Sequence, residues 1–283
     1  MSVTVNGVEL HCTTHGTGRP VLVIGGIHLD HSYLRPWLDP LGTSAQMIFL
    51  DVRGTGRSAR PETFEGIGHD TWTDDLDAVR QHLEHERVIL FGHSYGGFLA
   101  QEYAIRYGDR LDGLILCSTA PVLDFMEEAL ATAQQRGTPG QVAALVSGLS
   151  GSVESDDRLR AVWAKALPIY FHRFASHLAE GFGGGMQYSA AAINHAALNC
   201  LPQFNTLDAL GTITTPTLVV TGRHDWIAPP IHGAERLHSR LPRSELIVFE
   251  ESGHFPFIEE QDLFIERVAA WIGALPQGKR GLA

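Results

Sequence analysis

The chain has 283 residues, 44% of them hydrophobic and 19% charged, and its 32 acidic side chains against 21 Lys and Arg give a formal net charge of −11. This length and composition are typical of a globular protein with a substantial core. The acidic balance, with no basic run before Lys279-Arg280, argues against a surface that binds nucleic-acid phosphates. We therefore expect no nucleic-acid partner.

The first residues and the cysteines indicate the compartment. Residues 1–7 lack the basic and apolar regions of a signal peptide, and no apolar run approaches the roughly 18 residues that a membrane-spanning helix needs. Cys12, Cys117 and Cys200 are far apart and odd in number, so they cannot form a complete set of disulfides. We expect a cytoplasmic protein with no membrane contact, and the sequence leaves its oligomeric state open.

Short β-branched apolar runs alternate with helical patterns along most of the chain. This alternation predicts an α/β protein with a mostly parallel central sheet flanked by helices. Helices are expected where apolar residues recur at helical spacing, over 71–84, 98–107 and 263–271. The expected strands are 8–14, 21–25, 46–50, 87–91, 114–118, 217–221 and 245–249.

The alternation stops in the middle of the chain. From about residue 121 to 211 the sequence is rich in Ala, Gln and other helix formers, is interrupted by Gly-Ser and Gly-Gly-Gly segments, and shows no convincing strand. The strand and helix pattern then resumes near residue 215. We interpret residues 1–120 and 212–283 as one core domain and residues 121–211 as a helical cap inserted into it.

A serine lies at a tight turn between a predicted strand and a predicted helix. The turn is the run Gly92-His93-Ser94-Tyr95-Gly96-Gly97, which directly follows the strand ending at residue 91. In this context the serine is held on a strained backbone with its hydroxyl exposed, and small residues two positions before and after it avoid a clash. Ser94 is therefore the candidate nucleophile.

A serine hydroxyl needs a general base, and the base needs a carboxylate to orient it. The chain has 15 histidines, so position must select among them. His254 follows the last predicted strand and Asp225 follows the strand 217–221, which places both at the edge of the sheet where Ser94 emerges. The chain order Ser94, Asp225, His254 is the order of nucleophile, acid and base that accompanies such a turn. We expect these residues to form a catalytic triad.

These motifs resemble the α/β-hydrolase superfamily over nearly the whole chain. The resemblance is carried by the serine turn, by Gly222-Arg223-His224-Asp225 and by Ser252-Gly253-His254. Two further runs are similar to the proline-iminopeptidase-like and serine esterase branch, namely Leu29-Asp30-His31-Ser32-Tyr33-Leu34-Arg35-Pro36 and Asp51-Val52-Arg53-Gly54-Thr55-Gly56-Arg57-Ser58. Where that branch has His-Gly-Gly-Pro-Gly, this chain has Ile24-Gly25-Gly26-Ile27-His28, which keeps the glycine pair.

The resemblance implies an α/β-hydrolase fold with a helical cap after the sixth strand, matching residues 121–210. It also implies an oxyanion hole formed by the backbone N–H groups of Tyr95 and of the 25–27 loop, with Gly26 as the expected residue there. Such donors stabilise a tetrahedral intermediate by about 3–4 kcal/mol each. No cofactor is implied.

A metal site is not expected. The run His28-Leu29-Asp30-His31 resembles part of the HxHxDH pattern of metallo-hydrolases, but Gly26 replaces its first histidine and no separate ligand set completes it. We interpret Asp51 and Arg53 as an ion pair at a glycine turn.

The cap sequence favours a neutral substrate. Between residues 161 and 207 the only acidic residue is Glu180, whereas a proline iminopeptidase must hold a substrate ammonium, which is costly to bury unpaired. The same stretch is rich in large apolar side chains, namely Trp163, Tyr170, Phe171, Phe174, Phe182, Met186, Tyr188 and Phe204. We expect a serine hydrolase that cleaves a carboxylic ester or lactone, a large lactone included, through an acyl-enzyme on Ser94. The expected substrate-binding residues are Ile27, His28, His93, Trp163, Tyr170, Met186, Tyr188 and Trp226.

Two other functions stay open. The first is a proline-iminopeptidase-type aminopeptidase, and the second is a small-molecule receptor on the same fold in which turnover is incidental.

Overall fold

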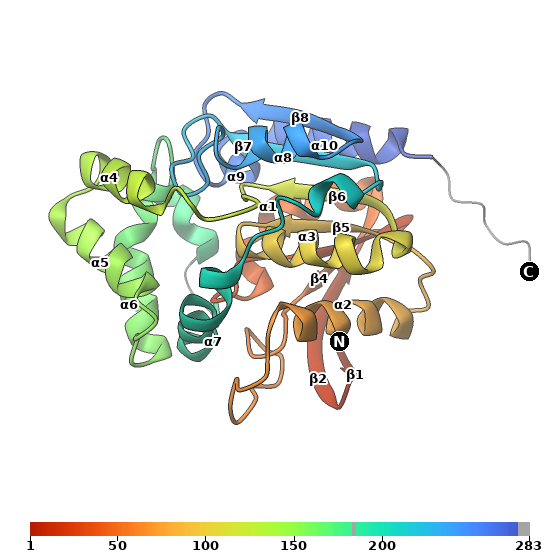
Figure 1. Ribbon diagram of the computed structural model, residues 1–283, viewed down its shortest axis with the longest axis horizontal. Helices are drawn as coiled ribbons and strands as arrows, with labels where there is room; N and C mark the ends of the chain where they lie inside the picture. Colours follow the sequence, from red (N-terminus) through yellow and green to blue (C-terminus); the bar gives the residue numbers. More distant parts are fainter. Residues whose placement is uncertain (183–184, 277–283) are drawn as a thin grey trace, which may run out of the picture.

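The apolar runs form one eight-stranded sheet in the computed structural model, which describes residues 1–182 and 185–276, with the side chains of residues 180 and 181 also undescribed (Figure 1). The order across the sheet is β1-β2-β4-β3-β5-β6-β7-β8. β2 is antiparallel to both neighbours, and all strands from β4 to β8 in this order pair in parallel. The strands are β1 Ser2–Val5, β2 Val8–His15, β3 Arg19–Ile24, β4 Ala45–Leu50, β5 Val88–His93, β6 Leu111–Cys117, β7 Thr217–Gly222 and β8 Ser244–Phe249.

The seven strands predicted from the sequence are all present, and β1 is an additional strand that the prediction misses. β1 has four residues, and only Val3 and Val5 of it are buried, so its alternating pattern is too short to stand out. Asn6 and Gly7 join β1 to β2 with φ angles of 48° and 73°. An Asn-Gly pair with positive φ at both positions is the preferred two-residue hairpin turn, and this signal would have revealed the strand.

Helices cover both faces of the sheet. α2, α3 and α8 lie on one face and α1, α9 and α10 on the other (Figure 1). The central strand β5 is buried at every position, as its continuously apolar run predicts, because helices pack on both of its sides. The helices outside the cap are α1 Arg35–Leu38, α2 His69–His82, α3 Tyr95–Tyr107, α8 Ala234–Arg240, α9 Pro256–Glu259 and α10 Gln261–Ala274.

Four further helices lie between β6 and β7 in the chain. They are α4 Met126–Arg136, α5 Pro139–Leu149, α6 Asp156–Ala166 and α7 Ala190–His195, joined by short helical turns that include η4 Leu167–Tyr170 and η5 Ser176–Phe182. α4, α5 and α6 stand beyond the carboxyl ends of the parallel strands (Figure 1). The described part of residues 121–211 contains no strand, and its β contact is a single bridge between Val122 and Asn205. The domain boundaries themselves stay a prediction.

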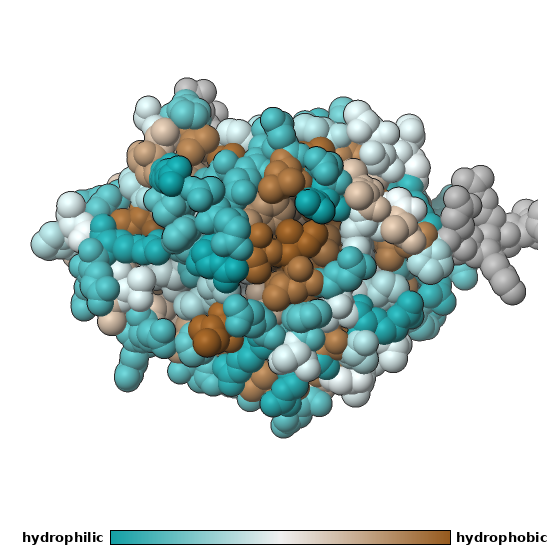
Figure 2. Space-filling model, turned by 90° about the horizontal axis from the view of Figure 1, so that it is seen from above, coloured by the Kyte–Doolittle hydropathy of each residue, from teal (hydrophilic) through white to brown (hydrophobic). Residues whose placement is uncertain are grey.

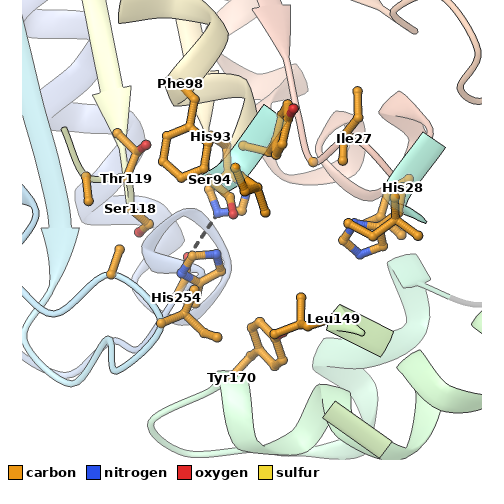
Figure 3. Close-up of a pocket in the computed structure, with 18 of the residues that line it drawn as sticks. Ile27, His28, His93, Ser94, Phe98, Ser118, Thr119, Leu149, Tyr170 and His254 are labelled. Atoms are coloured by element: carbon orange, nitrogen blue, oxygen red, sulfur yellow. Dashed lines mark hydrogen bonds between the residues drawn. The ribbon is translucent and has the colours of Figure 1, made fainter. Parts of the chain in front are cut away.

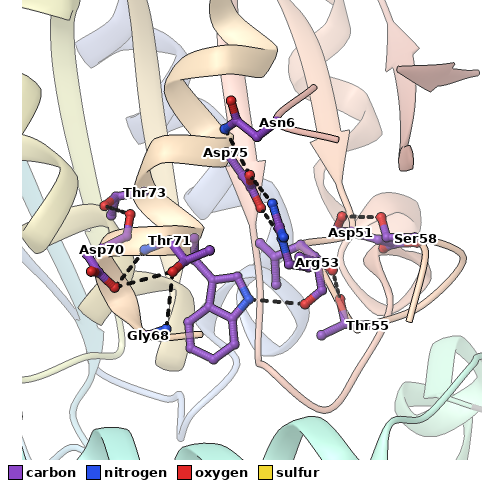
Figure 4. Close-up of polar contacts among 12 residues, drawn as sticks. Asn6, Asp51, Arg53, Thr55, Ser58, Gly68, Asp70, Thr71, Thr73 and Asp75 are labelled. Atoms are coloured by element: carbon purple, nitrogen blue, oxygen red, sulfur yellow. Dashed lines mark hydrogen bonds and ion pairs between the residues drawn. The ribbon is translucent and has the colours of Figure 1, made fainter. Parts of the chain in front are cut away.

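The loop between β4 and α2 is fixed by polar contacts that differ from the expected ion pair. Arg53 donates two bonds of 2.7 Å to Asp75 on α2, and Asn6 in the first hairpin donates to the same carboxylate (Figure 4). Asp51 instead accepts from the imidazole of His31 at 2.9 Å. The predicted Asp51 to Arg53 ion pair is therefore wrong, because each residue has a partner from a different segment.

The surface seen from above is mostly polar, with the largest group of apolar side chains near its centre and smaller apolar groups around it (Figure 2). None of the described helices is both long and apolar enough to cross a bilayer.

Candidate active site

Ser94 lies at the sharp turn between β5 and α3. Its φ of 55° is in the left-handed region, which a non-glycine residue adopts only when the surroundings enforce it. The Ser94 N–H donates to the carbonyl of Cys117 at 3.0 Å, which ties the turn to β6. A Cβ at Gly96 would lie 2.5 Å from the Ile24 carbonyl oxygen, and one at Gly92 would collide with the Gly96 carbonyl. Glycine is therefore required at both positions, as the sequence motif predicts.

Asp225 and His254 form a buried hydrogen-bonded pair. His254 Nδ1 lies 2.9 Å from Asp225 Oδ2, and Asp225 Oδ1 accepts from the backbone N–H groups of Ile227 and Ala228 at 3.0 and 3.1 Å. Because a carboxylate is only an acceptor, the His254 proton sits on Nδ1 and Nε2 is left free to accept a proton. The backbone N–H of His254 donates to the Tyr170 carbonyl at 2.8 Å, which links this loop to the cap.

Ser94 and His254 face one cavity between the sheet and the cap (Figure 3). Its volume of about 120 Å³ corresponds to roughly four water molecules at the density of liquid water. Most lining side chains are apolar, among them Ile27, Phe98, Leu149 and Tyr170. The described residues that line it include no Asp, Glu, Lys or Arg.

Five of the predicted substrate-binding residues line this cavity and three do not. Those that line it are Ile27, His28, His93, Trp163 and Tyr170. Met186, Tyr188 and Trp226 are buried elsewhere, which corrects the prediction for them. The Trp226 indole donates to the Ile169 carbonyl at 2.6 Å and so joins the loop after β7 to the cap, whereas the Tyr188 ring packs under the Arg160 guanidinium within the cap. The sequence shows that these side chains are aromatic or apolar, but it does not show which of them line the cavity and which pack inside the protein.

The backbone N–H of Gly26 is occupied in this structure. It donates to the Tyr33 hydroxyl at 2.9 Å, so the free oxyanion donor expected at Gly26 is not observed. The next N–H, of Ile27, bonds to no described residue. Tyr95 follows the nucleophile as expected and lines the cavity with Ser94. The composition of the oxyanion hole stays a prediction.

The Tyr33 hydroxyl also links Gly26 to the loop of His254. Tyr33 Oη lies 2.8 Å from His93 Nδ1. His93 Nε2 lies 3.1 Å from the His254 carbonyl oxygen (Figure 3). Burial, and then the proximity of His254, lowers the pKa of His93 well below its ordinary value, so this imidazole is neutral. A carbonyl only accepts, so His93 Nε2 carries the proton and Nδ1 accepts from Tyr33. The bonds therefore run in one direction, from Gly26 to His254.

The sequence analysis overlooks several residues that the structure places at the site. Tyr33 belongs to a run that was used only for the family resemblance, and nothing in its spacing indicates contact with His93. Ser118 and Thr119 directly follow β6 and line the cavity. Their position at the carboxyl end of a parallel strand, where ligands bind in open α/β sheets, was a usable signal.

The His and Asp side chains of residues 28–31 do not come together at one site. His28 lines the cavity, Asp30 accepts from the Ser32 backbone at 3.0 Å, and His31 pairs with Asp51. Among the described residues, possible metal-ligand atoms of His31, His11 and Asp51 lie within 4.8 Å of one another, outside the cavity lining.

Comparison with known proteins defines the class. The alpha/beta hydrolase fold family matches residues 19–261, and the chain belongs to this family. Within it, the chain is a proline-iminopeptidase-like member. It is 32% identical to the proline iminopeptidase PfmaB of Pestalotiopsis fici over 277 residues, which cover 94% of this chain and 96% of that protein.

Other relatives carry other names. The chain is 30% identical to the AB hydrolase superfamily protein YisY of Bacillus subtilis, over 92% of this chain and 93% of that one. A thermophilic esterase from Thermogutta terrifontis superposes with a TM-score of 0.76 and 25% identity, over 98% of this chain and 97% of the esterase. The chain is thus similar to both peptidases and esterases.

The Tyr33 link gives a prediction about stability. Tyr33→Phe leaves the buried Nδ1 of His93 without a donor, so the free energy of unfolding should fall by about 1–3 kcal/mol in urea titrations. Tyr188→Phe is the matched control, because that hydroxyl makes one long contact of 3.4 Å, and it should cost less. Equal losses in the two variants would show that the link contributes nothing specific.

Proposed function

We propose that the protein is a cofactor-independent serine hydrolase that cleaves neutral carboxylic esters or lactones through an acyl-enzyme on Ser94. The observation that carries the proposal is that His254, which is paired with the buried Asp225, faces the same cavity as a serine on a strained turn. Three free cysteines are consistent with action in a reducing cytoplasm.

The proposed reaction follows from the donors and acceptors of these side chains. The Ser94 oxygen attacks the ester carbonyl while His254 Nε2 takes the hydroxyl proton, and Asp225 holds the imidazole tautomer. The tetrahedral oxyanion is stabilised by backbone N–H groups at Tyr95 and in the 25–27 loop. His254 then returns the proton to the leaving alcohol. A water molecule, deprotonated by the same imidazole, attacks the acyl-enzyme and releases the acid and free Ser94.

The preference for a neutral substrate rests on the cavity lining. The described residues there offer no carboxylate for an ammonium and no cation for an acid. A charge transferred into such surroundings without a partner is strongly unfavourable, whereas apolar groups gain about 25 cal/mol per Å² buried. The cavity volume of about 120 Å³ suits the reacting part of a small or medium ester, and a large lactone would have to extend outside it.

The second candidate is an aminopeptidase of the proline iminopeptidase type. It is favoured by the 32% identity to PfmaB over nearly the whole of both chains. Such an enzyme would need an acidic group for the substrate ammonium, and Glu180, the acidic residue considered from the sequence, has its side chain outside the described residues. A non-catalytic receptor is the third alternative, and steady turnover would argue against it.

The role of Ser94 can be tested by substitution. Ser94→Ala should lower kcat for p-nitrophenyl esters by about 10⁵-fold or more while the unfolding transition is retained, because the nucleophile is lost. Asp225→Asn should lower kcat by about 10⁴-fold, because the imidazole would adopt the wrong tautomer. Ser239→Ala, which alters an exposed serine on α8, is the control and should keep full activity. Wild-type rates in Ser94→Ala would assign the chemistry to another residue.

The substrate class can be tested with a parallel panel. Initial rates on neutral p-nitrophenyl esters, on lactones and on prolyl and alanyl p-nitroanilides should give the highest kcat/KM for an ester or lactone, because neither needs a charged partner. Glu180→Gln should leave these rates unchanged. If aminoacyl anilides were the best substrates and Glu180→Gln selectively abolished their cleavage, the aminopeptidase function would replace the proposed ester or lactone hydrolysis.

A further inference from the structure

Several residues with unpartnered polar atoms line the cavity that holds Ser94. Among the described residues, eight buried side-chain nitrogen or oxygen atoms have no hydrogen-bond partner, and four of the eight residues line this cavity. The four atoms are His28 Nε2, Ser118 Oγ, Thr119 Oγ1 and Trp163 Nε1. Buried polar groups are nearly always paired in folded proteins, so this concentration indicates a ligand that completes them.

The four atoms belong to two places on opposite sides of the nucleophile. Ser118 and Thr119 follow β6 on one side of Ser94, and His28 lies on the other side (Figure 3). Trp163 of α6 joins the His28 side, because the two rings are in edge contact with centroids 4.7 Å apart. A substrate whose carbonyl lies at Ser94 can therefore extend towards either pair.

We propose that Trp163 and His28 form a subsite for an uncharged oxygen acceptor, so that the preferred ester carries a ketone, ether or hydroxyl oxygen away from the scissile bond. This inference rests on the proposed ester hydrolysis and adds a second recognition point to it. The hydroxyls of Ser118 and Thr119 can both donate and accept hydrogen bonds, so they do not determine whether a ligand group on their side of Ser94 is a donor or an acceptor.

The acceptor character follows from the Trp163 indole. Its N–H is a donor only, and the residue is 8% exposed, so water outside the protein does not satisfy it. The indole is in contact with two rings, those of Tyr170, at 4.9 Å between centroids, and of His28, which restrict its movement. A rigid buried donor selects a ligand that presents a lone pair.

The uncharged character follows from the neighbours. Burial, and then the proximity of His254, lowers the pKa of His28 to about 4, so its imidazole is neutral at neutral pH. The described cavity lining has no Lys or Arg to pair with a carboxylate or phosphate. An oxygen acceptor without charge is therefore the partner that this side can stabilise.

Matched ester pairs test the subsite. One series compares p-nitrophenyl hexanoate with p-nitrophenyl 5-oxohexanoate, and a second series places the added oxygen in the alcohol part of acetate esters. The measured quantity is the ratio of kcat/KM for the oxygenated and all-carbon members. Trp163→Phe should lower this ratio about five- to tenfold in one series, the effect of losing one hydrogen bond. Trp37→Phe is the control and should not change it, since the unpartnered Trp37 indole lies outside the cavity lining.

The outcomes separate the subsite from the proposed function. Ester hydrolysis that requires Ser94, with a ratio unchanged by Trp163→Phe in both series, would mean that the subsite holds water only. Wild-type rates no higher than those of Ser94→Ala on every ester would overturn the function and the subsite together. If Trp163→Phe fails to fold, His28→Leu provides the second comparison, and the same fall in the ratio is expected.

Discussion

The close approach of the first turn of α3 to the end of β3 is the constraint on which the site depends. Gly96 packs against the Ile24 carbonyl with no space for a side chain, and Gly92 has the same restriction against Gly96. This contact forces Ser94 into a left-handed backbone conformation and turns its side chain out of the sheet. The surrounding parallel strands are buried on both faces and keep the turn rigid, and their packing offsets the conformational strain at Ser94.

The same contact places the loop after β3 beside the nucleophile, and buried hydrogen bonds hold that loop to the base. Gly26, Tyr33 and His93 connect it to the backbone of His254, while Asp225 fixes the His254 side chain. The loop and the base are thus positioned by one continuous set of bonds. Because the internal members are buried, removal of any one leaves another polar group unpaired, which makes the arrangement sensitive to single substitutions.

Features that depend on the local sequence pattern could be predicted from the sequence. Continuously apolar runs such as β5 predicted buried strands, and the glycines around Ser94 predicted the turn, because both are dictated by neighbouring residues. β1 was missed because four residues carry little periodicity, although Asn6-Gly7 marked its hairpin. Which aromatic residues line the cavity could not be predicted. Trp163 and Trp226 have the same side chain, and only the tertiary packing places one beside His28 and lets the other donate to the Ile169 carbonyl.

The covalent nucleophile is the central claim, and a phosphonate ester tests it most directly because its adduct is not hydrolysed on the time scale of the assay. The protein would be incubated with a neutral alkyl p-nitrophenyl phosphonate, and the released p-nitrophenolate, the intact mass and the modified peptide would be measured. We predict one equivalent of p-nitrophenolate per chain, one adduct on Ser94, and loss of esterase activity in proportion to labelling. An adduct on a different residue, or full esterase activity after complete modification of Ser94, would contradict the account.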